Sequence, residues 1–195
     1  MPSLPTDRSK AELRATALAA RDALSVDQRV TAAQAIARRG LPIEIAPGTV
    51  VAGYAPIRSE FDPMPLLESL ADAGARLALP VIVGSDSALV FRSFSLREAL
   101  VRGPLGILQP ATRSAELVPD VLLVPLAAFD RSGHRIGFGG GYYDRTISTL
   151  REFKRAVAIG IAFAVQEIEA VPVLPHDAGL DFVLTERDTF DFRSK

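Results

Sequence analysis

The first 40 residues carry two helical patterns of apolar positions, and each pattern begins at a serine. Ser9 stands three residues before Glu12, the spacing of a capping box, in which each side chain accepts a backbone N–H of the other residue. The same pattern repeats at Ser25 and Gln28. Gly40 is typical of a helix end. The pattern therefore predicts two consecutive helices ahead of the first strand.

Beyond Gly40, short apolar runs alternate with segments of helical periodicity. Asp62 and Pro63 resemble a helix start, and Gly74 resembles its end. We expect strands at 49–55, 76–83, 88–94, 120–126, 156–161 and 181–185, and helices at 63–74 and 142–151. Residues 95–119 are ambiguous. Helix-like positions at 96–100 are followed by Gly103 and Pro104, which interrupt regular secondary structure.

This alternation predicts the fold class. Strands that alternate with helices favour an α/β fold with a mostly parallel sheet sandwiched by helices, a Rossmann-like three-layer arrangement. The chain shows no internal repeat and no linker, so we predict a single domain over residues 1–195. In such sheets, ligands bind at the carboxyl ends of the strands.

Composition narrows the functional classes. The chain has 195 residues, 48% hydrophobic residues and a net charge of −1, so it lacks the basic footprint of a nucleic-acid-binding protein. It has no cysteine, which excludes disulfides and thiolate metal sites, and its 2 histidines are too few for a zinc site. The N-terminal residues lack a signal-peptide core, and the apolar run at 121–129 is too short to span a bilayer. We expect a cytoplasmic monomer or weak homo-oligomer that binds a small molecule, without membrane or nucleic-acid partners.

The segment FDRSGHRIGFGGGYYDR, residues 129–145, concentrates the candidate chemistry. Its glycines expose backbone N–H groups, which in a tight turn form a concave site for an anion. Arg131, Arg135 and Arg145 add positive charge, and Asp130 and Asp144 add carboxylates. The spacing matches neither a P-loop nor the dinucleotide fingerprint. The segment is therefore either a phosphate cradle or an ordinary loop.

Four other residues are candidates for ligand binding. Lys10 and Arg14 share one helix face and either grip phosphates or form a solvated basic stripe continued by Arg21. Glu60 lies in a loop after a predicted strand, where it either binds a ligand N–H or is an exposed loop acid. Asp177 and Asp144 either hold Mg²⁺ or stabilise a turn and a helix start.

Taken together, these segments resemble the 5-formyltetrahydrofolate cyclo-ligase family, and the similarity runs along nearly the whole chain. The matching segments are Lys10–Arg14, Tyr54–Glu60 with Asp62, Gly103–Pro110, Val124–Asp130, Arg135–Arg145, Gln166 and His176–Glu186. The resemblance implies an enzyme that uses ATP and Mg²⁺ to close 5-formyltetrahydrofolate to 5,10-methenyltetrahydrofolate, releasing ADP and phosphate. In the mechanism proposed for the family, the formyl oxygen attacks the γ-phosphate, and the folate nitrogen N10 then attacks the activated carbon.

The resemblance also implies roles for individual residues. Lys10, Arg14 and Arg135 would act on the transferring phosphate, and Asp144 and Asp177 would hold Mg²⁺. The implied ATP-binding residues are Lys10, Arg14, Arg135, Ile136, Gly137, Phe138, Gly139, Gly140, Gly141, Tyr142 and Tyr143. The implied folate-binding residues are Ala55, Glu60, Gly137, Phe138, Gly139, Gly140, Gly141 and Tyr142.

Two positions depart from the family pattern. Phe138 stands where Tyr or Arg is frequent, so apolar packing or stacking there would replace a polar contact. Gln109 stands where Glu is frequent, which removes a charge from the segment before Pro110. Two alternatives stay open: a non-catalytic relative that binds a nucleotide, a folate or RNA, and a different α/β enzyme such as a sugar-phosphate isomerase.

Overall fold

The computed structural model describes residues 9–193, and its largest element is a sheet of eight strands. In chain order these strands are β1 (Val50–Ala52), β2 (Arg76–Val81), β3 (Val90–Ser93), β6 (Glu116–Leu117), β7 (Val121–Pro125), β10 (Val157–Ile161), β11 (Phe182–Leu184) and β12 (Thr189–Asp191). Their order across the sheet is β12-β11-β10-β7-β1-β2-β3-β6. The central strands β11, β10, β7, β1 and β2 run parallel, and β12, β3 and β6 pair antiparallel at the edges. The predicted α/β fold with a mostly parallel sheet is confirmed.

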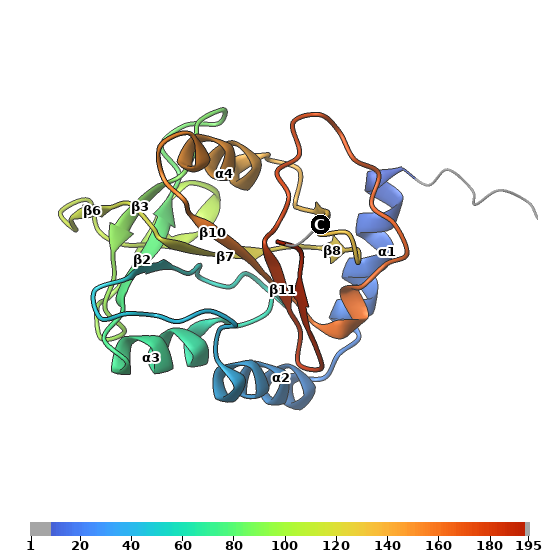
Figure 1. The fold of residues 1–195 in the computed structure, drawn as a ribbon, viewed down its shortest axis with the longest axis horizontal. Coiled ribbons are helices and arrows are strands. Elements are labelled where there is room, and N and C mark those ends of the chain that lie inside the picture. Colours follow the sequence, from blue (N-terminus) through green and yellow to red (C-terminus); the bar gives the residue numbers. More distant parts are fainter. Residues whose placement is uncertain (1–8, 194–195) are drawn as a thin grey trace, which may run out of the picture.

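Helices cover both faces of this sheet (Figure 1). The helices are α1 (Lys10–Asp22), α2 (Val26–Arg39), α3 (Met64–Asp72) and α4 (Tyr142–Phe153). Leu123 of β7 packs with α2 and α3 on one face, whereas Leu122 and Val124 pack with α4 on the other. This division follows from the strand period of two, which sends successive side chains to opposite faces.

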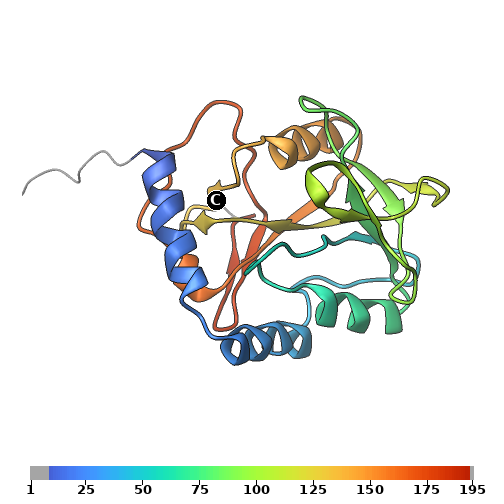
Figure 2. The ribbon, with the colours of Figure 1, turned by 180° about the vertical axis from the view of Figure 1, so that it is seen from behind.

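Helix α1 lies beside the sheet rather than on either face, next to β8 in both views (Figures 1 and 2). There, β8 (Ala128–Phe129) and β9 (Arg135–Ile136) form a small hairpin directly after β7. Ala17 of α1 packs with Ala128 and Ile136 of this hairpin in a separate apolar cluster. The predicted capping box at Ser9 is present, and it fixes where α1 begins. The hairpin follows β7 along the chain and packs against α1, so it holds α1 beside the sheet.

The structure assigns elements to the region that the sequence left ambiguous, and it contains strands that were not predicted. Residues 95–119 contain no α-helix; they form β4 (Val101–Arg102), a 3₁₀ turn η1 (Pro104–Gly106), β5 (Leu108–Gln109) and β6. Pro104 and the positive φ of 74° at Gly106 are incompatible with a continuous helix there. Strands β8, β9 and β12 were not predicted; β8 and β9 have two residues each, too few to show a period.

The expectations about membranes concern two parts of the chain. Within residues 9–193, no helix combines the length and the apolar character needed to cross a bilayer. The prediction that the N-terminus lacks a signal peptide rests mainly on residues 1–8, which lie outside the described residues.

The packing around Gly160 in β10 yields a test of the fold. A Cβ at this position would lie 2.7 Å from Leu180 Cδ1 and 2.8 Å from Leu126 Cδ2. Gly160→Ala should therefore lower the free energy of unfolding by about 1–3 kcal/mol, the usual cost of overpacking. Urea unfolding measures this, with Gly179→Ala as control, because a Cβ there has no neighbour within 4 Å. Equal stabilities of the two variants would contradict the packing described for β10.

Candidate functional site

The glycine-rich loop, residues 137–141, joins β9 to the N-terminus of α4. Gly139 and Gly141 have φ values of 99° and 64°, a region that side-chain-bearing residues avoid. Within the described residues, the backbone N–H groups of 138–141 donate to no acceptor. Since α4 begins at Tyr142, the positive end of its dipole lies at the same place. The loop therefore offers an open set of donors suited to an anion.

Arg135 supplies a fixed positive charge directly before this loop. It is only 7% exposed, and its Nη2 donates to Asp144 Oδ1 at 2.8 Å. Its Nη1 donates to the Ala178 carbonyl, and the Ala178 N–H donates to the same Asp144 oxygen at 3.1 Å. Burial lowers the pKa of Arg135 and the Asp144 carboxylate opposes that shift; a guanidinium nonetheless stays protonated. Arg135 thus joins three segments of the chain around one buried charge.

Helix α1 contributes the other two predicted cations, and both face inward. Lys10 Nζ lies 2.5 Å from Asp177 Oδ2, and Arg14 Nε donates to the Gly137 carbonyl at 2.7 Å. Within the described residues, the two Nη nitrogens of Arg14 donate to no protein acceptor. The alternative of a solvated basic stripe is therefore wrong for this helix, because its continuation at Arg21 is only 4% exposed.

Asp144 and Asp177 lie close to each other and to the loop. Asp144 accepts the N–H of the residue that follows Asp177, and both carboxylates act electrostatically on Arg135. Burial raises the pKa of Asp177, but hydrogen bonds from Lys10 and the Leu174 N–H outweigh it, so the pKa is lowered overall. Within residues 9–193, no group of three or more His, Cys, Asp or Glu residues forms a metal cluster. Mg²⁺ bound beside phosphates needs only one or two carboxylates, and this pair fits that requirement.

Glu60 lies in the loop that follows β1, the parallel neighbour of β7. Its Oε2 accepts the Ile57 N–H at 2.9 Å, and between them Arg58 has a φ of 55°, an uncommon backbone conformation for a non-glycine residue. Burial raises the pKa of Glu60, against the Ile57 hydrogen bond and the positive charge of Arg21. Ala55, in the same loop, is buried.

The two tyrosines at the start of α4 face different surroundings. The Cζ atom of Arg145 lies 5.2 Å from the centre of the Tyr142 ring, and both side chains are partly exposed. The Tyr143 hydroxyl is buried, and burial together with the negative charge of Glu60 raises the pKa of Tyr143. Glu60 and Arg135 both act electrostatically on Tyr143, so its hydroxyl lies between the Glu60 loop and the charge that precedes the glycine-rich loop.

Three residues of the 129–145 segment have structural partners instead. Buried Asp130 accepts the N–H groups of Ser132, His134 and Val171, which fixes the β8–β9 turn. Arg131 pairs with Glu167 at the surface, beside a cavity of about 520 Å³. Arg145 donates to the carbonyls of Ser85 and Gly140, which braces the loop from outside. Arg135 and Asp144 are the charged residues of this segment that lie at the N-terminus of α4, beside the glycine-rich loop.

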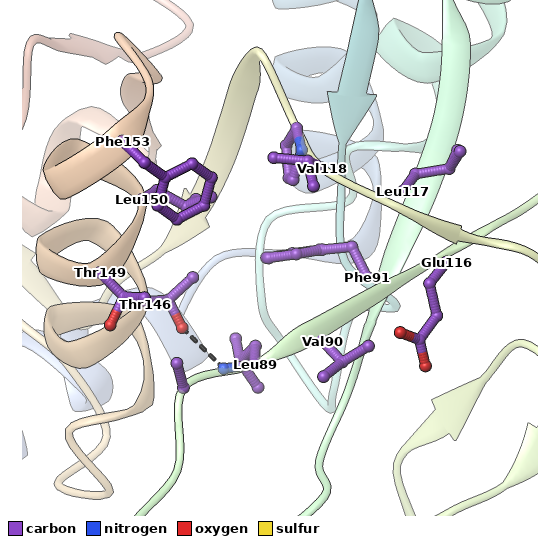
Figure 3. A pocket seen from close by; sticks show the side chains of 12 residues that line it. Leu89, Val90, Phe91, Glu116, Leu117, Val118, Thr146, Thr149, Leu150 and Phe153 are labelled. Atoms are coloured by element: carbon purple, nitrogen blue, oxygen red, sulfur yellow. Dashed lines mark hydrogen bonds between the residues drawn. The ribbon is translucent and has the colours of Figure 1, made fainter.

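A separate apolar groove of about 250 Å³ lies between α4 and the β3–β6 edge (Figure 3). Two of its polar side chains already have partners, since the Thr146 hydroxyl accepts the Leu89 N–H at 2.8 Å and Glu116 pairs with Arg92. The sequence-predicted residues do not line it, so we do not place the chemistry there.

Comparison with known proteins agrees with this geometry. The profile of the 5-formyltetrahydrofolate cyclo-ligase family matches residues 6–186. The 5-formyltetrahydrofolate cyclo-ligase of Escherichia coli K12 is 34% identical over 180 residues, covering 88% of this chain and 97% of its own. That of Mycolicibacterium smegmatis is 35% identical over 197 residues, covering 92% and 95%. The chain belongs to the 5-formyltetrahydrofolate cyclo-ligase family, a family of ligases.

The solved structures support the same assignment of the fold. The structure of Aquifex aeolicus 5,10-methenyltetrahydrofolate synthetase has a TM-score of 0.78 and 30% identity, covering 94% of this chain and 93% of its own. A synthetase of the same name from Mycoplasma pneumoniae has a TM-score of 0.73 at 24% identity, covering 92% and 99%. The second likeness concerns the fold alone.

The raised pKa of Glu60 predicts a pH-dependent gain in stability for Glu60→Gln. A carboxyl whose pKa is higher in the folded protein destabilises the fold once it ionises. The gain in stability of Glu60→Gln over wild type should be absent at pH values below 4.5, the ordinary pKa of a glutamate. It should grow as the pH rises through the raised pKa of Glu60, and stay constant at higher pH. Thermal unfolding between about pH 4 and about pH 8 measures it.

Glu44→Gln is the matched control for this test, because Glu44 is exposed. At each pH in the same range, the Tm of Glu44→Gln should equal that of wild type. A Tm of Glu60→Gln that falls relative to wild type as pH rises would show that the Glu60 carboxylate stabilises the fold instead.

Proposed function

We propose that this protein closes 5-formyltetrahydrofolate to 5,10-methenyltetrahydrofolate at the expense of ATP, in a site centred on Arg135 and the glycine-rich loop. One observation carries the proposal. Three cations from distant parts of the chain, Lys10, Arg14 and Arg135, converge on a loop whose backbone N–H groups lack partners. The Glu60 loop follows a neighbouring parallel strand, and Glu60 and Arg135 both act electrostatically on Tyr143. Family membership supplies the reaction.

The cations and the loop account for the phosphate half of the reaction. An amide oxygen is a poor leaving group, so it must be converted into a phosphate ester before the ring can close. Phosphoryl transfer depends mainly on positioning and on charge neutralisation. In the proposed arrangement, Lys10, Arg14 and Arg135 hold the phosphates and residues 137–141 cradle them. Asp144 and Asp177 would hold Mg²⁺, which shields phosphate charge when bound. Ile136, Phe138 and Tyr143 would complete the ATP contacts.

The folate half needs orientation more than acid–base chemistry. The formyl oxygen attacks the γ-phosphorus and ADP leaves. N10 then attacks the phosphorylated carbon and loses its proton, the C–O bond breaks, and phosphate departs with the former formyl oxygen. Glu60 would accept hydrogen bonds from the pteridine ring, with Ala55 and Tyr142 beside the substrate. This division explains why a nucleophile–base pair is not required. We also propose that the protein acts in the cytoplasm on small molecules alone, as a monomer or weak homo-oligomer.

Formation of the methenyl product gives the direct assay. Purified protein with 5-formyltetrahydrofolate should generate the methenyl absorbance only when both ATP and Mg²⁺ are present. Turnover without ATP would contradict the proposed chemistry. Binding of both ligands by folded protein without any turnover would instead establish the non-catalytic alternative.

Replacement of Arg135 tests the phosphate assignment. Arg135 is too buried for truncation to alanine, which would leave Asp144 unpaired. Arg135→Lys keeps the charge but loses the planar fork that contacts both Asp144 and Ala178. We expect kcat/KM for ATP to fall by about 10²–10³-fold, the cost of one transition-state donor.

Arg151→Lys is a close control for this variant. Arg151 also bonds a carboxylate, Asp181, and a backbone carbonyl, that of Gly179, but it is not among the residues assigned to the site. It should keep nearly wild-type kcat/KM. A folded Arg135→Lys variant with equally normal kinetics would remove Arg135 from the phosphate site.

A further inference from the structure

Arg21, in the last turn of α1, has a nitrogen that the protein leaves without a partner. The residue is only 4% exposed, and its Nε donates to Ser59 Oγ at 3.1 Å. Its Nη1 is buried and has no hydrogen-bond partner in the described part of the chain. Buried guanidinium nitrogens are almost always bonded, so an orphaned one in a native protein requires an explanation.

A second orphaned group lies in the same region. The Tyr143 hydroxyl is also buried and lacks a partner within residues 9–193. Arg21 and Tyr143 both interact electrostatically with Glu60. The ion pair of Arg21 nonetheless goes to Asp22, at 3.7 Å, and not to Glu60. The Arg21 guanidinium and the Glu60 carboxylate thus lie near one another, and no ion pair between them is present in the described residues.

An aromatic ring lies beside this donor and acceptor. The Cζ of Arg21 is 5.7 Å from the centre of the Phe138 ring, and Phe138 is 47% exposed although it is a large apolar side chain. A flat ligand lying along Phe138 would present its edge to Arg21 and Glu60. This arrangement gives the departure from the family pattern at Phe138 a physical role, because a planar ring can stack where a polar contact is missing.

Two observations favour a neutral ligand group over a phosphate at Arg21. Arg21 lies seven residues beyond Arg14, which is about 10 Å along a helix axis. An anionic ligand group at Arg21 would also meet the negative charge of Glu60. The complementary ligand edge is neutral, with an acceptor for Arg21 next to a donor for Glu60. An amide edge, C=O beside N–H, has this pattern.

We propose that Arg21 Nη1 donates to the ring carbonyl oxygen, O4, of the folate substrate while Glu60 accepts from the adjacent N3–H. Arg21 is then a specificity-determining residue that recognises a 4-oxo pteridine ring. The inference rests on the proposed function. It adds which edge of the pteridine ring, O4 with N3–H, the site recognises.

A pair of ligands that differ at this ring edge tests this assignment. In the 4-amino-4-deoxy analogue of 5-formyltetrahydrofolate, an amino donor replaces the carbonyl acceptor that faces Arg21, and N3 loses the hydrogen that faces Glu60; the comparison of Arg21 variants isolates the first contact. Calorimetric Kd values should show that wild type prefers the carbonyl ligand. Arg21→Met should weaken binding of the carbonyl ligand by about 10- to 100-fold, the value of a hydrogen bond to a charged group, and leave the analogue nearly unchanged.

Three further measurements make the outcome decisive. Arg38→Met, at an exposed position on α2, should keep the wild-type preference. Arg21→Lys, which keeps the charge, should lose only part of the preference and serves if Arg21→Met does not fold. Equal weakening of both ligands, or an unchanged preference in folded variants, would overturn the assignment of Arg21. Wild-type protein that neither binds nor converts 5-formyltetrahydrofolate would overturn the proposed function, and this inference with it.

Discussion

The ion pair between the buried Arg135 side chain and the partly exposed Asp144 carboxylate is the contact on which the arrangement of the site depends. It links β9 to the first turn of α4, and through Ala178 it links both to the segment that precedes β11. Breaking a buried pair by removing one partner typically costs about 3–5 kcal/mol, because the remaining charge stays buried. The pair therefore holds the glycine-rich loop between two fixed ends, and within residues 9–193 the N–H groups of 138–141 donate to no protein acceptor.

The second constraint is the contact of α1 with this loop. Lys10 and Arg14 come from the first described helix, yet they bond Asp177 and the Gly137 carbonyl, far along the chain. The same helix face carries Arg21 toward the Glu60 loop. One helix thus contributes cations along its length: two beside the loop where phosphates would lie, and one farther on where the pteridine ring would lie. A rigid helix sets the distance between these regions.

The sequence predicted the layers of the fold because the central elements are long enough to show a period. Val121–Pro125 and the helix at Tyr142 are examples. The two-residue strands at 101–102 and 108–109 carry no such signal, since pairing alone defines them. Within the site, the segment around Arg135 was visible because its residues are close in sequence.

Contacts between distant segments were beyond sequence pattern alone. The resemblance to a known family connected Lys10 and Asp177 with the loop, but neither spacing nor periodicity did. Arg21 was interpreted as part of a solvated stripe; its seven-residue distance from Arg14 was a usable signal, because residues so spaced share a helix face. Whether that face points inward depends on tertiary packing, which only the structure shows.

In the proposed reaction, the formyl oxygen is phosphorylated before the ring closes. The most direct test of this step is to follow that oxygen atom. With 5-formyltetrahydrofolate carrying ¹⁸O in the formyl group, a turnover with unlabelled ATP should place the label in inorganic phosphate, detected by mass spectrometry. Label found in water, with unlabelled phosphate, would contradict the account.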